Sequence, residues 1–335
     1  MDAYGRRVAV GVETDVDLCA GTLRSFDAHV AFVEEELGVV RPPDDTLELF
    51  VVEDTAQWCK EVEACYIGGW VDATFVPSKG ARSVWHEIVH HVVAGSSVGM
   101  TDRFLSEGLA SALGDDWCPP SADLVWPRAP LRDLLGRREV RYEHYPRAAQ
   151  FVDFVRDRYG ADTLRDLIRC VDREDPLRIV ERCFQRTFGK GINEVDAEFS
   201  RHPPDNHESL ALCGGPVERW TAQRTWHHAV SLSCEDPSTV NTFEDVYGRE
   251  VTTLLEVPRP GWYEVEVSGD GEATVEVEPC FCPSRPGALL GSARSGMLWV
   301  GEPGTHRVSV RTDDPWATRA HVTLTPTQRD PSPPV

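Results

Sequence analysis

The chain has 335 residues, and 34 Lys and Arg against 55 Asp and Glu give a formal net charge of −21 at pH 7. This length exceeds what one small core requires, so two domains are expected. The negative charge argues against nucleic acid and anionic membranes as partners because both would repel it. No stretch approaches the ~20 consecutive apolar residues of a membrane span.

Residues 7–76 alternate between strand and helix patterns. The sequence predicts strands over 7–13 and 47–53 and an extended segment over 66–76. A helix is expected over 22–37, where apolar residues recur at helical spacing, and Asp54 can cap a short helix through 63. These elements predict a small sheet ahead of the next helix.

Residues 86–90 read His-Glu-Ile-Val-His. Because residues four apart share one face of an α-helix, His86 and His90 can both present a ring nitrogen to one metal ion. Glu87 would lie on the flank of this pair, where it can reach an activated water without binding the metal. The alternative is a histidine pair satisfied within a helical core. Val84, Ile88, Val92 and Val93 supply an apolar side, and Gly95–Ser97 ends the helix.

A second helix is predicted around residues 104–112, which read FLSEGLASA, with Thr101 or Asp102 as N-cap and Gly114 near its end. Glu107 is the natural third ligand, because catalytic zinc usually takes three protein ligands. The alternative is a surface glutamate. The short connection predicts antiparallel helices, and the small residues Gly108 and Ala110 would let the second helix pack closely on the first. His91 lies about 140° round the helix from His86 and is expected to be a packing or surface residue.

The two motifs together resemble the gluzincin metallopeptidases, in which HExxH is followed by W-L-x-E-G-x-A. The resemblance covers residues 86–114 and is weaker further along the chain. It implies a Zn²⁺ cofactor bound by His86, His90 and Glu107, with Glu87 as general base, and a peptide or protein substrate.

The resemblance also implies that the strand upstream of the zinc helix borders the cleft and can pair with extended substrate. Gly68–Asp72 is the candidate for this edge, and an ordinary interior strand is an equal alternative. The segment Tyr145–Val152 resembles the helix that follows the third ligand in several gluzincin-like peptidases. Tyr145 and His144 are therefore candidates to donate a hydrogen bond to the developing oxyanion. A capping or packing cluster with Tyr142 is the alternative.

Helices are further predicted over 145–159, 162–171, 177–188 and 192–199. Residues 205–216 are expected to be a linker between a catalytic domain over 1–204 and a β-sandwich over 217–325, and 326–335 a Pro-rich tail. Adjacent His227 and His228 would point to opposite faces of a strand and are discounted as metal ligands. Six period-two segments indicate the sandwich, namely 251–257, 261–267, 273–277, 296–300, 306–310 and 321–324.

Six of the ten cysteines precede residue 205 and four follow it. Both numbers are even, as disulfides confined to each domain would require, and Cys59–Cys65 and Cys170–Cys183 are plausible short-range pairs. Disulfides favour an oxidising compartment, so a secreted, periplasmic or cell-surface protein is expected, with reduced core thiols as the alternative. Residues 1–7 do not lead into a signal-peptide pattern, so we expect any signal to have been removed.

The sequence thus predicts an α+β zincin-like domain, with a small mixed sheet and a helical bundle, followed by an all-β sandwich. The expected function is zinc-dependent peptide hydrolysis by a secreted enzyme. The alternative is a non-catalytic protein of zincin fold that recognises a glycan or a cell-surface partner through its sandwich.

Overall fold

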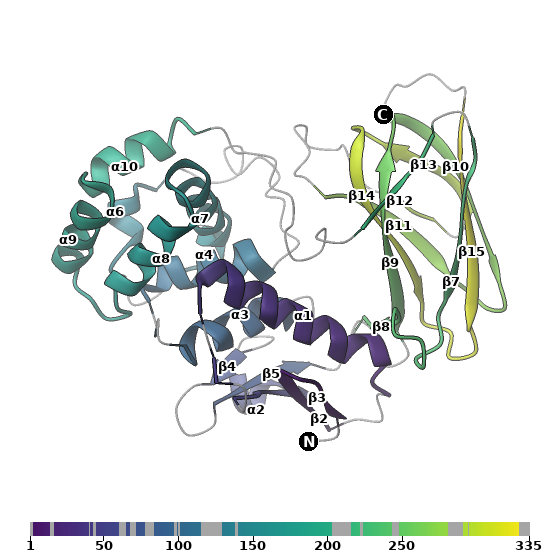
Figure 1. Ribbon diagram of the computed structural model, residues 1–335, viewed down its shortest axis with the longest axis horizontal. Helices are drawn as coiled ribbons and strands as arrows, with labels where there is room; N and C mark the ends of the chain where they lie inside the picture. The colour runs from purple at the N-terminus through teal and green to yellow at the C-terminus, as the bar shows by residue number, and fades with distance from the viewer. Residues whose placement is uncertain are drawn as a thin grey trace.

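The computed structural model describes residues 3–13, 17–39, 41–42, 45–59, 65–67, 72–77, 84–96, 99, 101–114, 129–137, 140–202, 216–221, 224–242, 248–280, 291–293 and 295–327. A region of mixed sheet and helices comes first in the chain, and a region of two β-sheets follows (Figure 1). The coarse α+β class predicted from the sequence is confirmed.

The N-terminal sheet has five strands in the order β1-β2-β3-β5-β4. The central strands β2, β3 and β5 are parallel, whereas β1 and β4 are antiparallel to their neighbours at the two edges. The extended segment predicted over 66–76 therefore belongs to two strands. The bounds are β1 Ala3–Tyr4, β2 Val8–Val12, β3 Leu47–Val52, β4 Cys65–Ile67 and β5 Ala73–Pro77.

Alternating side chains give this sheet two apolar faces. Leu47, Leu49 and Val51 of β3 belong to the main core, which includes residues of α1 and α3. The intervening Phe50 and Val52 belong to a smaller cluster, with Phe75 of β5. The period-two pattern thus turns one face of the sheet toward the helices that carry the site.

The long helices agree closely with the predicted ranges and pack around the main core, and the short helix α6 was not predicted. Trp58 of the short helix α2 stacks on Phe75, so α2 lies against the smaller cluster. The bounds are α1 Ala20–Leu37, α2 Ala56–Cys59, α3 Val84–Ala94, α4 Arg103–Gly114, α6 Leu131–Leu134, α7 Tyr145–Tyr159, α8 Ala161–Cys170, α9 Leu177–Phe188 and α10 Ile192–Phe199, with a 3-10 turn over Tyr142–His144.

Two glycines allow α4 to pack closely on its neighbours. A Cβ atom on Gly114 would lie 2.6 Å from the backbone nitrogen of His86, which places the end of α4 against the start of α3. The two helices are therefore antiparallel, as predicted. A Cβ atom on Gly108 would lie 2.6 Å from the carbonyl oxygen of Ala148 in α7. Helix α4 packs closely on α3, as predicted, but the face of α4 that carries Gly108 is turned toward α7.

Asp102 is the N-cap of α4. Its Oδ1 accepts a hydrogen bond from the backbone N–H of Phe104 at 2.9 Å, and its Oδ2 accepts one from Gly136 at 2.8 Å. Thr101 instead forms an isolated β-bridge with Asp172. Of the two caps that the sequence left open, the carboxylate is the one used, since it satisfies a free N–H in the first turn.

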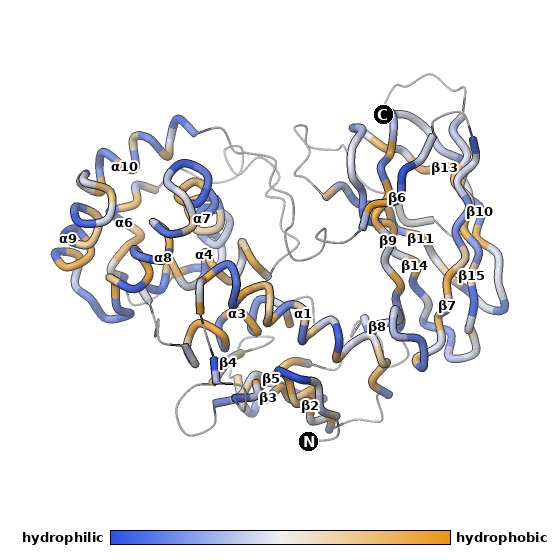
Figure 2. Tube along the Cα trace, in the orientation of Figure 1, coloured by the Kyte–Doolittle hydropathy of each residue, from blue (hydrophilic) through white to orange (hydrophobic). Residues whose placement is uncertain are grey.

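The C-terminal region packs a four-stranded sheet, β13-β10-β15-β7, against a sheet in the order β12-β11-β14-β9-β6, with β8 also paired to β9. Every predicted strand is present, and β6, β7, β8 and β12 were not predicted. Apolar and polar residues alternate along the long strands (Figure 2). The bounds are β6 Val217–Arg219, β7 Trp226–Ser231, β8 Val240–Asn241, β9 Arg249–Val257, β10 Gly261–Gly269, β11 Thr274–Pro279, β12 Gly291–Ala293, β13 Ser295–Val300, β14 Gly304–Thr312 and β15 Arg319–Pro326.

Three disulfides join described residues. Cys59–Cys65 and Cys170–Cys183 are the two predicted pairs. The third, Cys19–Cys234, links the start of α1 to the β-sandwich, so the expectation that disulfides stay within each domain is wrong. Cys19 and Cys234 can pair because α1 contacts β8, and this contact brings the two regions together (Figure 1).

These disulfides are compatible with an oxidising, extracellular environment. None of the described helices combines the length and apolar character needed to cross a membrane. Residues 205–215 of the expected linker and 328–335 of the expected tail lie outside the described residues.

Candidate metal centre

Helix α3 carries both histidines of the predicted site. Ile88 and Val92 are buried in the main core and fix the rotation of the helix. This rotation turns His86 and His90 toward α4, with their ring centroids 4.8 Å apart. The side chains of His86 and His90 are 8% and 16% exposed, so both are largely buried and His90 is the more accessible of the two.

Helix α4 brings Glu107 to the same point. Its Oε2 lies 3.3 Å from Nε2 of His86 and 3.2 Å from Nε2 of His90, and the two Nε2 atoms are 3.1 Å apart. The three residues are the only group of three or more metal-binding side chains found among the described residues. The structure therefore brings together the three ligands that the sequence predicted.

The geometry of the three atoms fits a metal ion. Two imidazole nitrogens and a carboxylate oxygen form a donor set that zinc commonly takes. Ligand atoms about 2.0–2.1 Å from a tetrahedral ion lie about 3.3 Å from each other, close to the observed separations. The group can thus hold a metal ion with little movement of its side chains, and three protein ligands leave a fourth position open.

The charge of Glu107 is stabilised where it is needed. Burial acts to raise the pKa of Glu107, but the positive charges of His90 and His86 and their hydrogen bonds outweigh it and hold this pKa far below its usual range. A carboxylate ligand must be ionised, so Glu107 meets that requirement. Arg103, one helical turn before Glu107, and Arg173 contribute positive charge to this neighbourhood.

Ser106 contacts the His90 ring at the nitrogen that faces away from the metal group. Its Oγ lies 3.1 Å from Nδ1 of His90. A histidine that binds a metal ion is neutral, and with the ring proton of His90 on Nδ1 and donated to this oxygen, the lone pair of Nε2 would be free for the ion. Such an outer partner fixes the orientation and tautomer of a histidine ligand. This role of Ser106 was not predicted from the sequence, although its position directly before Glu107 is a signal that could have indicated it.

The edge strand of the sheet holds Glu87. Its Oε2 accepts a hydrogen bond of 2.9 Å from the backbone N–H of Tyr66 in β4. Glu87 is 9% exposed and is not one of the three converging ligands. The Glu87 carboxylate is thus held by the sheet edge outside the three-ligand group, and its charge acts on Tyr145, whose ring stacks on His86.

Tyr145 covers the other side of the group. Its ring stacks on His86, with centroids 5.8 Å apart and an interplanar angle of 6°. Burial, the charge of Glu107 together with a hydrogen bond to it, and the charge of Glu87 all raise the pKa of the Tyr145 phenol. The phenol therefore keeps its proton at neutral pH and can act as a hydrogen-bond donor.

His144 and Tyr142 lie further out. The ring of Tyr142 is 5.4 Å from that of Tyr145, and Tyr142 is 71% exposed. Partial burial lowers the pKa of His144, in spite of the nearby Glu143 charge, and the nearest carboxylate to its Nε2 is Glu143 at 3.8 Å. Of the two oxyanion donors proposed from the sequence, Tyr145 is the one that contacts the metal group.

His91 is a packing residue, as expected. It is 3% exposed, its Nδ1 is hydrogen-bonded to Thr74 Oγ1 at 3.0 Å, and its ring lies against Tyr66. His227 and His228 lie on β7, and Nε2 of His228 is hydrogen-bonded to Thr253.

Of the proposed edge segment Gly68–Asp72, residues 68–71 lie outside the described residues. The described edge strand is β4, which is antiparallel to β5. The strand that meets Glu87 is therefore at the edge of the sheet.

Comparison with known proteins adds no family. No protein-family model matches the chain, and no curated protein sequence matches it. What the chain does must therefore be argued from the side chains of this site.

Proposed function

We propose that the protein is a zinc-dependent hydrolase of peptide bonds, with a zincin-like catalytic domain. One observation carries the proposal: His86, His90 and Glu107 converge from two facing helices, and Glu87, the residue after His86, stays outside the group and is held by Tyr66 of β4. This separation of three ligands from one adjacent carboxylate suits a metal that activates water for attack on a carbonyl group.

Zinc is the ion that we propose for this donor set. Two histidines and one carboxylate are typical of catalytic zinc, whereas magnesium and calcium prefer oxygen ligands alone. Zinc held there supplies a Lewis acid that polarises a carbonyl and lowers the pKa of water. His86, His90 and Glu107 would hold it.

Proton transfer and stabilisation of the oxyanion would be carried out by Glu87 and Tyr145. Glu87 accepts a proton from the attacking water and returns it to the leaving amine, as a general base and then a general acid. Tyr145 stays protonated and donates a hydrogen bond to the oxygen that gains negative charge. The backbone of β4 at Tyr66 holds Glu87 through its N–H group, which orients the carboxylate.

The test compares the wild type with Glu87→Gln on an unbiased peptide library, read by mass spectrometry. We expect the variant to keep one zinc per chain by elemental analysis and to lose about 10²–10⁴-fold in turnover, because the amide cannot accept the proton. The matched control is Glu143→Gln, a carboxylate whose side chain is 36% exposed. It should cleave like the wild type.

Cleavage by Glu87→Gln at the wild-type rate would refute this role of Glu87. A wild type that binds zinc and cleaves no peptide would instead favour the non-catalytic binding protein.

A further inference from the structure

Helix α1 lacks a cap of its own. The first N–H groups of an α-helix have no acceptor within the helix and need one elsewhere. Cys19 occupies the N-cap position of α1 and makes no side-chain capping hydrogen bond. The acceptors must therefore come from another part of the chain.

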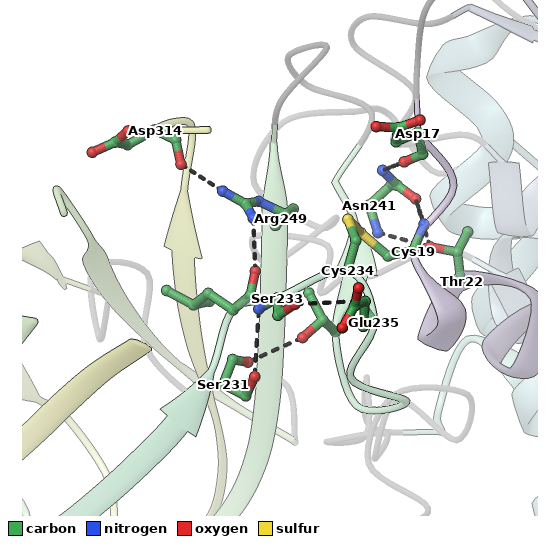
Figure 3. The surroundings of a disulfide bond; sticks show 12 residues. Asp17, Cys19, Thr22, Ser231, Ser233, Cys234, Glu235, Asn241, Arg249 and Asp314 are labelled. Carbon is green, nitrogen blue, oxygen red and sulfur yellow. Dashed lines mark hydrogen bonds between the residues drawn. A yellow bond between two sulfur atoms is a disulfide. The ribbon is translucent and has the colours of Figure 1, made fainter. Parts of the chain in front are cut away.

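The β-sandwich supplies them (Figure 3). Oδ1 of Asn241 accepts the N–H of Cys19 at 2.8 Å. The carbonyl oxygens of Cys234 and Thr239 accept the N–H groups of Ala20 and Gly21 at 2.8 and 3.0 Å. Three successive donors at the start of α1 thus bind residues more than 200 positions later in the sequence.

The approach is tight enough to require glycine. A Cβ atom on Gly21 would lie 2.3 Å from the carbonyl oxygen of Thr239, inside any allowed contact. Thr239 is fully buried and Thr22 is 2% exposed, so this contact is closed to solvent. It is a packed junction of the two regions.

Asn241 is the centre of this junction. Thr22 Oγ1 donates to its Oδ1 at 2.7 Å, and its own backbone N–H donates to Thr22 Oγ1 at 2.8 Å. Its side-chain amide also donates to the carbonyl oxygen of Asp17 at 3.0 Å. The disulfide Cys19–Cys234 fixes the same contact covalently.

From the junction, α1 leads to the metal group. The rings of Phe26 and His29 lie 5.2 and 5.0 Å from that of Trp85, and Nε2 of His29 donates to the carbonyl oxygen of Trp85 at 3.2 Å. Trp85 directly precedes His86. A cavity of about 40 Å³ lies between the junction and α3, lined by Thr22, Ser25, Phe26, Val84, Trp85, Val240, Asn241 and Thr242.

We propose that the β-sandwich is a positioning element of the metal centre: Asn241 and Cys19–Cys234 hold α1, and α1 holds Trp85 and thereby His86. The inference rests on the proposed function only in taking His86 as a metal ligand. It makes the sandwich part of the catalytic unit rather than a detachable recognition module.

The experiment uses the full chain, three asparagine variants and a variant in which both cysteines are replaced by serine. Asn241→Ala removes the side-chain acceptor and donor, and Asn241→Asp keeps an acceptor at a helix N-terminus, where negative charge is favourable. Asn193→Ala, an exposed asparagine of α10, is the matched control. Zinc affinity is measured by competition with a chelator, and amide hydrogen exchange is followed by mass spectrometry on the metal-free protein.

For Asn241→Ala we expect amide exchange about 5- to 30-fold faster at the start of α1 and faster exchange over 84–90. Zinc affinity, measured well below the unfolding temperature, should fall about 2- to 30-fold. Asn241→Asp should restore part of the slow exchange and of the zinc affinity, because it keeps the acceptor for Cys19 and Thr22 but loses the donor to Asp17, and Asn193→Ala should change neither. Replacing both cysteines by serine should enlarge the effect of Asn241→Ala, because the two devices hold one contact.

Faster exchange confined to α1, with unchanged exchange over 84–90 and unchanged zinc affinity, would overturn the proposal. It would show that the sandwich caps α1 without positioning the site. Zinc affinity and amide exchange are both measured without turnover. A protein that cleaves no peptide would therefore refute the hydrolase proposal without affecting this test.

Discussion

Ser106 and His90 come from different helices and meet at 3.1 Å, Oγ to Nδ1, on the side of the ring that faces away from the metal group. The contact ties the orientation of a ligand on α3 to the residue before the ligand on α4. Metal affinity should therefore depend on a hydroxyl that cannot touch the metal.

The first prediction concerns this hydroxyl. Ser106→Ala should lower zinc affinity about 10- to 100-fold, as loss of an outer partner of a histidine ligand typically does. The matched control is Ser111→Ala on the same helix, because Ser111 Oγ is buried and has no hydrogen-bond partner among the described residues. Chelator competition checks both, and equal affinities of the two variants would contradict the role of Ser106.

The second prediction concerns the phenol of Tyr145. Tyr145→Phe keeps the ring against His86 and removes the donor, so kcat should fall about 10²–10³-fold, with a small change in KM. Tyr142→Phe, whose ring is exposed, should behave as the wild type. Steady-state kinetics on one cleaved peptide measure both. A loss confined to KM would point to substrate packing.

The third prediction concerns the ligand on the second helix. Glu107→Ala leaves two histidines, and zinc affinity at pH 7 should fall by at least about 10- to 100-fold. Glu181→Ala, on α9 and half exposed, should keep one zinc per chain. The metal content of both variants is measured after dialysis. If Glu107→Ala keeps one zinc per chain, Glu107 is not a metal ligand.

The fourth prediction concerns the cap of α4. Asp102→Ala removes the acceptor for Phe104 and leaves the N–H of Gly136 without one, which should cost about 1–3 kcal/mol of unfolding free energy. Thr101→Val should cost much less, because Thr101 Oγ1 makes no hydrogen bond within the part of the chain that the structure describes. Urea unfolding measures both, and similar costs would mean that the carboxylate is not the cap.

The fifth prediction concerns the pH dependence of stability. Burial lowers the pKa of His29 from 6.5 to about 4, against a raising effect of its hydrogen bond to Trp85. Between about pH 4 and pH 6.5, His29 is therefore protonated in the unfolded chain and neutral in the folded chain. Stability should fall as the pH drops from about 6.5 to 4, by on the order of 3 kcal/mol from this residue.

His29→Gln checks this prediction. Whatever its stability at neutral pH, its unfolding free energy should fall less steeply than that of the wild type over the same pH range. Urea unfolding at several pH values measures the slope, and an unchanged slope would show that His29 does not titrate in this way.

The helices could be predicted from the sequence because their signals are local. Apolar spacing gave Leu177–Phe188 and Ile192–Phe199 with the observed bounds. His86 and His90 shared a helix face by spacing alone, and Glu107 followed from its distance along the chain. Short strands such as Val240–Asn241 could not be predicted, because two residues carry no period and pair only when a neighbour is in place.

Contacts between residues far apart in the sequence could not be predicted. Six and four cysteines are equally compatible with pairs inside and between domains, and only the approach of α1 to β8 selects Cys19–Cys234. The cap of α1 by Asn241 has no local signal, since Cys19 is a poor cap and its partner lies 222 positions away. That Gly108 packs on α7 could not be predicted, because a small residue predicts a close contact and not its partner.

The disulfide Cys19–Cys234 closes most of the chain into a covalent loop, with a sequence separation of 215. A single cleavage by any protease between these two cysteines, the expected linker included, therefore leaves the fragments in one molecule. On a non-reducing gel such nicked protein migrates as one species, and it separates only after reduction. Trimming by another enzyme or by the protein itself would thus change the backbone without releasing the β-sandwich from the metal-binding region.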